Sequence, residues 1–188
     1  MNKIKILAVI GSLRKESINR KLALKAKELC PENVEFEILD YSAVPFMNED
    51  MEFPVPDGVK AVRDKVKSAD AIWFFTPEYH HSYPGVLKNL LDWLSRSPGN
   101  SEPHVLGGKP AAISGASHGM SGTVICQEFL VPLLSFFNMK LLNTHRTCVP
   151  NAFNLLKDNN LVLGDSEKFL AAQVQAFLDF IKSENCSC

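Results

Sequence analysis

Residues 4–19 have the sequence IKILAVIGSLRKESIN, in which an apolar run ends at Gly11 and a short polar segment follows. The apolar run predicts a buried strand, and the apolar spacing after Ser17 predicts a helix that begins there. The first turn of a helix has several amide groups without partners and carries the positive end of the helix dipole. A polar loop between such a strand and such a helix is therefore predicted to bind a phosphate group.

Three side chains of this loop have the chemistry that phosphate binding requires. The hydroxyl groups of Ser12 and Ser17 can donate hydrogen bonds, and the guanidinium group of Arg14 can add a charged contact. Ser17 and Asn19 are also favourable residues at a helix start, so part of the pattern has a purely structural explanation. Gly11 is the sole glycine here, so the loop matches neither the dinucleotide fingerprint nor the P-loop, which favours a terminal monophosphate over a buried pyrophosphate.

Apolar runs alternate with helical periodicities along the rest of the chain. We expect strands at 4–10, 34–39, 70–76, 111–116 and 140–144, and helices near 17–30, 57–68, 84–96, 121–138 and 166–182. This alternation predicts a five-stranded parallel sheet of order 2-1-3-4-5 with helices on both faces. The alternating segment VEFEIL is expected near a sheet edge, and Pro132 is expected to kink or split the fourth helix.

The composition is typical of one globular domain that comprises residues 1–188. Hydrophobic residues make up 46% of the chain, charged residues make up 22%, and the net charge is -1 without a long basic run. Nucleic acids and anionic membranes are therefore not expected as partners. The first apolar run is too short for a signal peptide or a membrane span, so the cytoplasm is the expected location.

The five cysteines have no spacing typical of a zinc site or a redox dithiol, and the five histidines show no HxxxH pair. We therefore expect no bound metal. Cys186 and Cys188 form a C-x-C sequence at the C-terminus, for which an inert tail and a soft-metal or redox role are both open.

A second candidate loop follows the third predicted strand, in the sequence PEYHHSYPGVLKNLLDWLSR that begins at Pro77. Ligands of open parallel sheets bind at the carboxyl ends of the strands, where the winding reverses, so this loop should lie beside the first one. Pro77 and Tyr79 offer flat apolar surface, and Glu78, His80 and His81 add polar groups, as a planar heterocycle requires. The alternative is that the prolines only end a strand and start a helix, and Trp93 farther along is expected in the core.

A third loop, SGASHGMSGT at 114–123, follows the fourth predicted strand. Gly115, Gly119 and Gly122 would let the main chain approach a flat ligand, and its amides could face negative charge on that ligand. Alternatively, these glycines only form the turn, with Ser121 or Thr123 as the helix cap. His118 is expected to be a surface histidine without a chemical role.

Together these loops resemble the NADPH-dependent FMN reductase family of flavodoxin-like proteins, which includes quinone, chromate and azo-dye reductases. The matching segments are GSLRKESIN, PEYHHSYPGVLKNLLDWLSR and GKPAAISGASHGMSG, and weaker similarity continues to the end of the chain. The resemblance implies a flavodoxin-like three-layer sandwich. It also implies FMN contacts, which are Ser12, Arg14, Ser17, Ile18 and Asn19 for the phosphate, Pro77, Glu78, Tyr79 and His80 for the ring, and Ala116 and Ser117 in the third loop. The family more often has asparagine where His80 stands and a smaller or different residue at His81.

The resemblance further implies a ping-pong reaction. NADPH or NADH reduces bound FMN and leaves, and a small electron acceptor then binds where the nicotinamide was. No catalytic residue is expected, because the flavin carries the chemistry. Arg96 matches a family position near a subunit contact, although a cation favourable to the helix dipole is an equal explanation. A homodimer or homotetramer is expected. The alternative function is an FMN-binding electron carrier between protein partners without nicotinamide turnover, although such carriers are usually more acidic than this chain.

Overall fold

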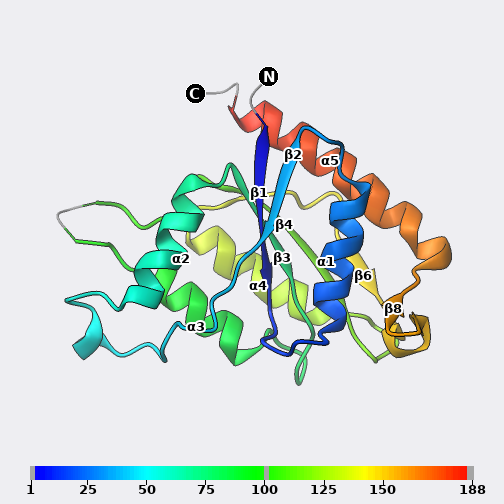
Figure 1. Cartoon of the computed structure of the whole chain (residues 1–188), viewed down its shortest axis with the longest axis horizontal. Coiled ribbons are helices and arrows are strands. Elements are labelled where there is room, and N and C mark those ends of the chain that lie inside the picture. The colour runs from blue at the N-terminus through cyan, green and yellow to red at the C-terminus, as the bar shows by residue number, and fades with distance from the viewer. Residues whose placement is uncertain (1–2, 100–101, 186–188) are drawn as a thin grey trace.

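The computed structural model describes residues 3–99 and 102–185 (Figure 1). The strands are β1 (Ile4–Ile10), β2 (Val34–Ile38), β3 (Ala71–Phe75), β4 (Pro110–Ala116), β5 (Lys140–Leu141), β6 (Thr147–Val149), β7 (Leu156–Lys157) and β8 (Asn160–Leu161). The α-helices are α1 (Ile18–Leu29), α2 (Asp57–Ser68), α3 (Gly85–Leu94), α4 (Val124–Phe136) and α5 (Glu167–Asn185). Three short 3₁₀ helices are η1 (Glu49–Met51), η2 (Ala152–Leu155) and η3 (Gly164–Ser166).

The main sheet has the strand order β2-β1-β3-β4-β5, and all of its pairings are parallel. This confirms the predicted order. The nearly continuous apolar strands β1 and β3 lie inside the sheet, while β2 alternates between buried and exposed residues and forms one edge. Central strands are covered on both faces, so they need apolar residues at every position, whereas an edge strand does not.

The predicted fifth strand at 140–144 is wrong in its extent, because two short strands share that edge. Lys140 pairs with Pro110 in β5, and Thr147 pairs with Ser114 in β6, so the edge chain advances seven residues while β4 advances four. The three extra residues belong to the polar segment 143–146, which follows the last main-chain bond of Leu142 to β4 and leaves the sheet between the two strands. A local insertion of this kind disrupts the ladder without changing the strand order.

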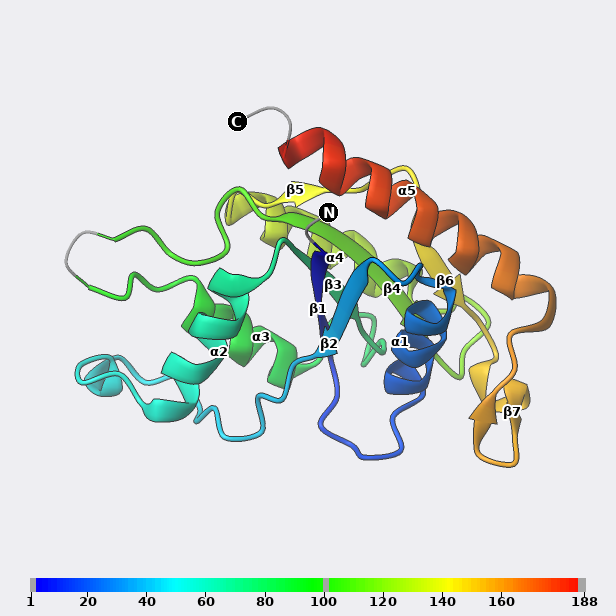
Figure 2. The ribbon, with the colours of Figure 1, turned by 45° about the horizontal axis from the view of Figure 1, so that its top comes forward.

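Helices cover the sheet on both faces and give a three-layer sandwich. Helices α1 and α5 pack on one face (Figure 2). Helices α2, α3 and α4 supply the apolar residues that pack on the other face. The observed bounds agree with the predicted helices to within three residues, and α4 remains helical through Pro132, so the expected split does not occur.

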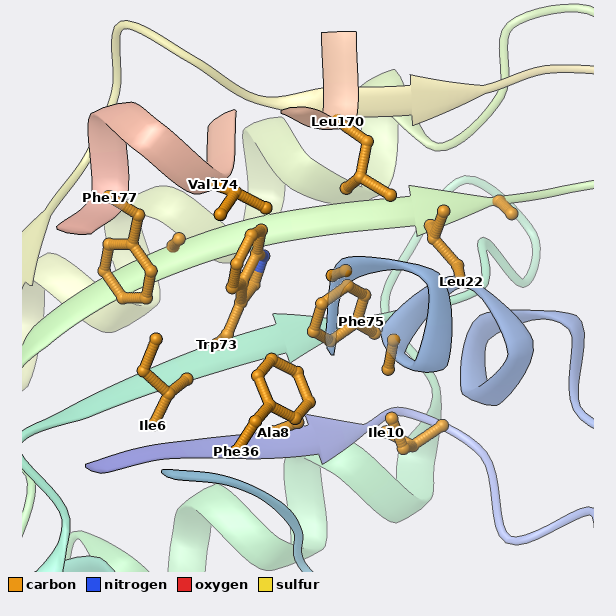
Figure 3. Packing of buried hydrophobic residues seen from close by; sticks show 14 of the residues in the cluster. Ile6, Ala8, Ile10, Leu22, Phe36, Trp73, Phe75, Leu170, Val174 and Phe177 are labelled. Carbon is orange, nitrogen blue, oxygen red and sulfur yellow. The ribbon is translucent and has the colours of Figure 1, made fainter. Parts of the chain in front are cut away.

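Aromatic side chains fill the layer between the sheet and α5. The Trp73 ring lies 5.1 Å from that of Phe75 and 5.2 Å from that of Phe177, measured between centroids, and all three side chains are fully buried (Figure 3). The indole N–H of Trp73 donates to Ser114 Oγ at 2.9 Å, and that hydroxyl donates to Gln173 Oε1 at 2.8 Å. This packing joins β3, β4 and α5. On the opposite face Trp93 is fully buried, as predicted.

Two features of the C-terminal part were not predicted. The strands β7 and β8 form a small antiparallel hairpin, and η2 and η3 flank it.

Within the described ranges, no helix is both long and apolar enough to cross a membrane. Among the same residues, no cluster of three histidine, cysteine, aspartate or glutamate side chains could hold a metal ion. Cys186 and Cys188 lie outside the described residues.

The carboxyl ends of β1, β3 and β4 meet closely around Thr76. A Cβ atom on Gly11 would lie 2.7 Å from Thr76 Oγ1, and one on Gly115 would lie 2.4 Å from the carbonyl oxygen of Thr76. Both distances are too short for a side chain. Glycine at these two positions therefore allows the loops after the three strands to converge.

Candidate functional site

A cavity of about 420 Å³ opens between the loops that follow β1, β3 and β4. Its lining contains all eleven residues that the family resemblance implies as ligand contacts: Ser12, Arg14, Ser17, Ile18, Asn19, Pro77, Glu78, Tyr79, His80, Ala116 and Ser117. It also contains His81, His118, Gly119 and Ser121, which were not in the predicted set although they belong to the same loops. We refer to it as the main cavity.

The loop after β1 presents donors and a cation to the main cavity. Ser17 is the N-cap of α1, and its Oγ accepts from the amide of Arg20 at 3.4 Å. The amides of Ile18 and Asn19 open the helix and have no acceptor within it. In the described part of the chain, the guanidinium group of Arg14 makes no hydrogen bond and no ion pair. This end of the cavity is therefore suited to an anionic group.

The side chain of Asn19 has a role that the sequence did not reveal. Its Nδ2 donates to the carbonyl oxygen of Ala116 at 2.9 Å, and its Oδ1 accepts from the amide of Ala116 at 2.8 Å. Both amide atoms of the side chain are thus engaged with the end of β4. Asn19 fixes the third loop against the first, and only its main-chain amide remains for a ligand.

The loop after β3 turns through two residues with positive φ. Tyr79 and Ser82 exchange two main-chain hydrogen bonds of 2.9 Å, while His80 and His81 between them have φ angles of 50° and 60°. Two such residues form a type I′ hairpin turn, which favours Asn-Gly over bulky side chains. The turn presents the side chain of Tyr79 with 54% of its surface exposed at the cavity wall.

Glu78 binds protein groups rather than standing free in the main cavity. One carboxylate oxygen accepts from the amide of Cys126 at 2.9 Å in the first turn of α4, and the other lies 3.3 Å from His81 Nδ1. A carboxylate at a helix start interacts favourably with the unpaired amides and with the helix dipole. Glu78 therefore anchors the second loop to α4.

The loop after β4 is also held by its own polar groups. The hydroxyl of Ser117 donates to the carbonyl oxygen of Gly122, and its amide donates to that of Val149 at 3.1 Å. The sequence led us to expect that Gly115 admits a flat ligand, but Gly115 does not line the main cavity, and a Cβ atom there would lie 2.2 Å from Thr123 Oγ1. Core packing requires that glycine. His118 borders the cavity and stacks on Phe153 with centroids 5.5 Å apart.

Arg96, a further candidate from the sequence, lies away from the main cavity, and the thiols of Cys126 and Cys148 are unreactive. Arg96 follows α3 and pairs with Glu52 and, at 3.2 Å, with Glu49, so it does not line the cavity. Burial raises the pKa of the Cys126 thiol to about 12 and also raises the pKa of Cys148. Neither thiol is therefore a nucleophile near neutral pH.

The arrangement favours a flat ring system with a phosphate-bearing tail. The first loop supplies hydroxyls, helix-start amides and an unpaired guanidinium group, while the second and third loops supply a tyrosine, a proline and small residues. The cavity volume lies in the range of about 300–1,000 Å³ that is usual for small-molecule sites.

Comparisons with known proteins agree with this arrangement. Residues 4–154 match the family model described as NADPH-dependent FMN reductase. The chain is 37% identical to a 2-hydroxy-1,4-benzoquinone reductase of Burkholderia sp over 94% of this chain and 93% of that protein. It is 39% identical to an NAD(P)H-dependent FMN reductase of Pseudomonas aeruginosa over 90% of each.

The fold is also similar to a solved flavoenzyme. The structure of the NAD(P)H:(acceptor) oxidoreductase FerB from Paracoccus denitrificans superposes with a TM-score of 0.85 at 31% identity, covering 96% of this chain and 98% of that one. The likeness includes the C-terminal part that follows the region matched by the family model.

Proposed function

The chain belongs to the NADPH-dependent FMN reductase family, and from this premise we propose that it is a quinone reductase with FMN in the main cavity. It is an oxidoreductase that depends on FMN and NAD(P)H and transfers electrons to a small acceptor. Quinones are the favoured acceptor class because several relatives, including the one from Burkholderia sp, are quinone reductases.

The phosphate of FMN fits the first loop. Ser12 and Ser17 would donate their hydroxyl hydrogens, the amides of Ile18 and Asn19 would donate from the helix start, and Arg14 would add a charged contact. Asn19 also holds the end of β4 in place, so it would support the phosphate site and the ring site together.

The ring of FMN fits between the second and third loops. Pro77 and Tyr79 would supply apolar contact, and the main chain of Glu78, His80, Ala116 and Ser117 would line the polar edge of the ring. Bound FMN supplies the hydride chemistry, and the protein holds and orients it. Because Glu78 and Ser117 are already hydrogen-bonded to protein groups, this wall is fixed before a ligand enters.

One observation carries this proposal. Three loops that are far apart in the sequence converge on one cavity with an anion-binding end and an aromatic end. A helix start by itself would not support FMN as the ligand, because its amide donors could bind any anion.

The test is steady-state turnover by FMN-loaded protein with NADPH or NADH and 1,4-benzoquinone. We expect quinone-dependent oxidation of the nicotinamide and parallel double-reciprocal plots as both substrates vary, because both would use the same face of the ring in turn. An electron carrier would bind FMN without this turnover. Protein that is yellow and fully loaded but oxidises neither nucleotide would overturn the enzymatic proposal while leaving the FMN site intact.

Assembly and location are part of the same proposal. Phe46, Met51 and Phe53 lie in one segment around η1 and are 83%, 41% and 63% exposed, which supports a homodimer or homotetramer with this surface covered. A particle of 20.9 kDa in light scattering would contradict it.

We place the protein in the cytoplasm, and fractionation of cells that express the untagged chain tests that assignment.

A further inference from the structure

A second cavity lies on the other side of the loop that follows β1. It has a volume of about 370 Å³ and lies between that loop, α1 and the segment 38–42, which begins at the last residue of β2. Ser12 and Arg14 line both this cavity and the main one. We call it the side cavity. Because the two cavities share a wall, one extended ligand can reach both.

The side cavity gathers cations that have no partner. Arg14, Lys15 and Arg20 all line it, and in residues 3–99 and 102–185 none of the three forms an ion pair or a side-chain hydrogen bond. Two lysines of α1 differ, since Lys21 pairs with Glu16 at 2.7 Å and Lys25 pairs with Glu28 at 2.6 Å. Cations without ion-pair partners that line one cavity favour an anionic ligand.

The remaining polar groups of the side cavity do not neutralise these charges. Asp40 is the one carboxylate on its wall, and it accepts from the amide of Ser42 at 3.0 Å. Arg20 attracts Asp40 electrostatically but forms no ion pair with it within 4 Å. Three cations therefore face one carboxylate that is bound to its own loop.

The wall of the side cavity is rigid and partly apolar. Tyr41 is 5% exposed, and its hydroxyl donates to the carbonyl oxygen of Ile10 at the end of β1. Leu39 beside it is 4% exposed. A buried aromatic and aliphatic wall beside exposed cations is suited to a heterocycle that bears a phosphate.

The FMN proposed above uses few of these cations. Its single phosphate would be served by Arg14, the hydroxyls and the helix-start amides, which leaves Lys15 and Arg20 for a second anion. The other phosphorylated ligand of this family is the nicotinamide dinucleotide. NADPH differs from NADH by a phosphate on the 2′-position of the adenosine ribose, which is a second terminal monoester.

We infer that the side cavity binds the 2′-phosphoadenosine end of NADPH, with Lys15 and Arg20 on the 2′-phosphate, and that it selects NADPH over NADH. This inference rests on the proposed function, because it assumes that the nicotinamide of the same molecule reaches the flavin in the main cavity. Arg14 then stands between the two phosphate sites and separates their ligands.

The test uses the FMN-loaded protein and a double variant, Lys15→Ala with Arg20→Ala. Calorimetry with 2′,5′-ADP and with 5′-ADP measures the 2′-phosphate contribution without turnover. We expect wild-type protein to bind 2′,5′-ADP at least about tenfold more tightly, as charged hydrogen bonds at a partly exposed site allow, and the double variant to lose the difference. The preference should weaken with added salt because the cations are exposed.

Kinetics with the two nucleotides distinguishes this inference from the proposed function. In the double variant KM for NADPH should rise about tenfold, while KM for NADH and the Kd of FMN stay within about twofold. Lys27→Ala, which removes a cation from the other end of α1, should change none of these values. Equal binding of 2′,5′-ADP and 5′-ADP by the wild type would overturn the inference, as would an equal rise of both KM values. Absence of turnover with either nucleotide would instead overturn the proposed function.

Discussion

The loop after β1 and the loops after β3 and β4 line the same cavity but use their polar side chains differently. In the first loop, Arg14 and Lys15 are exposed and form no ion pair among the described residues. In the other two, Glu78 is bonded to the start of α4 and Ser117 to its own turn. The first loop therefore leaves its cationic side chains without a protein partner, whereas the other two loops present a wall whose polar side chains are already bonded to the protein.

The strongest test of this difference is an added methyl group in β4, directly behind the wall. Gly115→Ala should lower the free energy of unfolding by about 3 kcal/mol, because its Cβ would lie 2.2 Å from Thr123 Oγ1 and 2.4 Å from a carbonyl oxygen. Gly119→Ala in the loop that follows β4 is the control, since the nearest atom is 3.8 Å away. Denaturant unfolding measures both. Equal stabilities would show that the wall adapts as freely as a surface loop.

Arg14 tests the opposite property in the first loop. Arg14→Ala should raise the Kd of FMN about 10-fold to 100-fold, the value of a charged hydrogen bond to phosphate, and leave the stability of the protein without FMN unchanged. FMN fluorescence titration measures the affinity. Lys27→Ala removes a cation from the opposite end of α1 and should bind FMN normally. Unchanged affinity in Arg14→Ala would place the phosphate elsewhere.

The sequence predicted the features that depend on local pattern. The period of the apolar residues gave the order of elements, and the polar residues after Gly11 and Thr76 marked the loops that converge. The family resemblance supplied the individual contact residues. What local pattern could not supply was the partner of each polar side chain.

Asn19 illustrates this limit. Asparagine is a residue type that is favourable at helix starts, yet the side chain of Asn19 binds the main chain of Ala116, which is 97 residues away. The divided edge strand and the side cavity are similar cases. Each depends on how segments from different parts of the chain pack together, and neither has a periodicity of its own.

Glu78 gives a smaller test of the wall. Glu78→Ala should cost about 1–2 kcal/mol of stability, because the amide of Cys126 at the start of α4 loses its acceptor. Glu78→Gln retains an acceptor and should cost less. Both variants should change the Kd of FMN only a few-fold. If Glu78→Gln weakened FMN as much as Arg14→Ala, the carboxylate would contact the ligand directly and the comparison of the loops would fail.

The turn at His80 and His81 gives the smallest expected effect. Both residues have positive φ, which asparagine and glycine adopt at lower cost, so His80→Asn combined with His81→Gly should raise the free energy of unfolding by about 0.5–1 kcal/mol. The double variant also loses the contact of His81 with Glu78. Because the His81 side chain is largely exposed, this loss should lower the free energy of unfolding only slightly. We expect kcat with 1,4-benzoquinone to stay unchanged, because the wall acts through its main chain. A more stable variant with a lower kcat would contradict this expectation. It would mean that the imidazoles of His80 and His81 interact with the acceptor, at a cost in stability that the family's usual residues avoid.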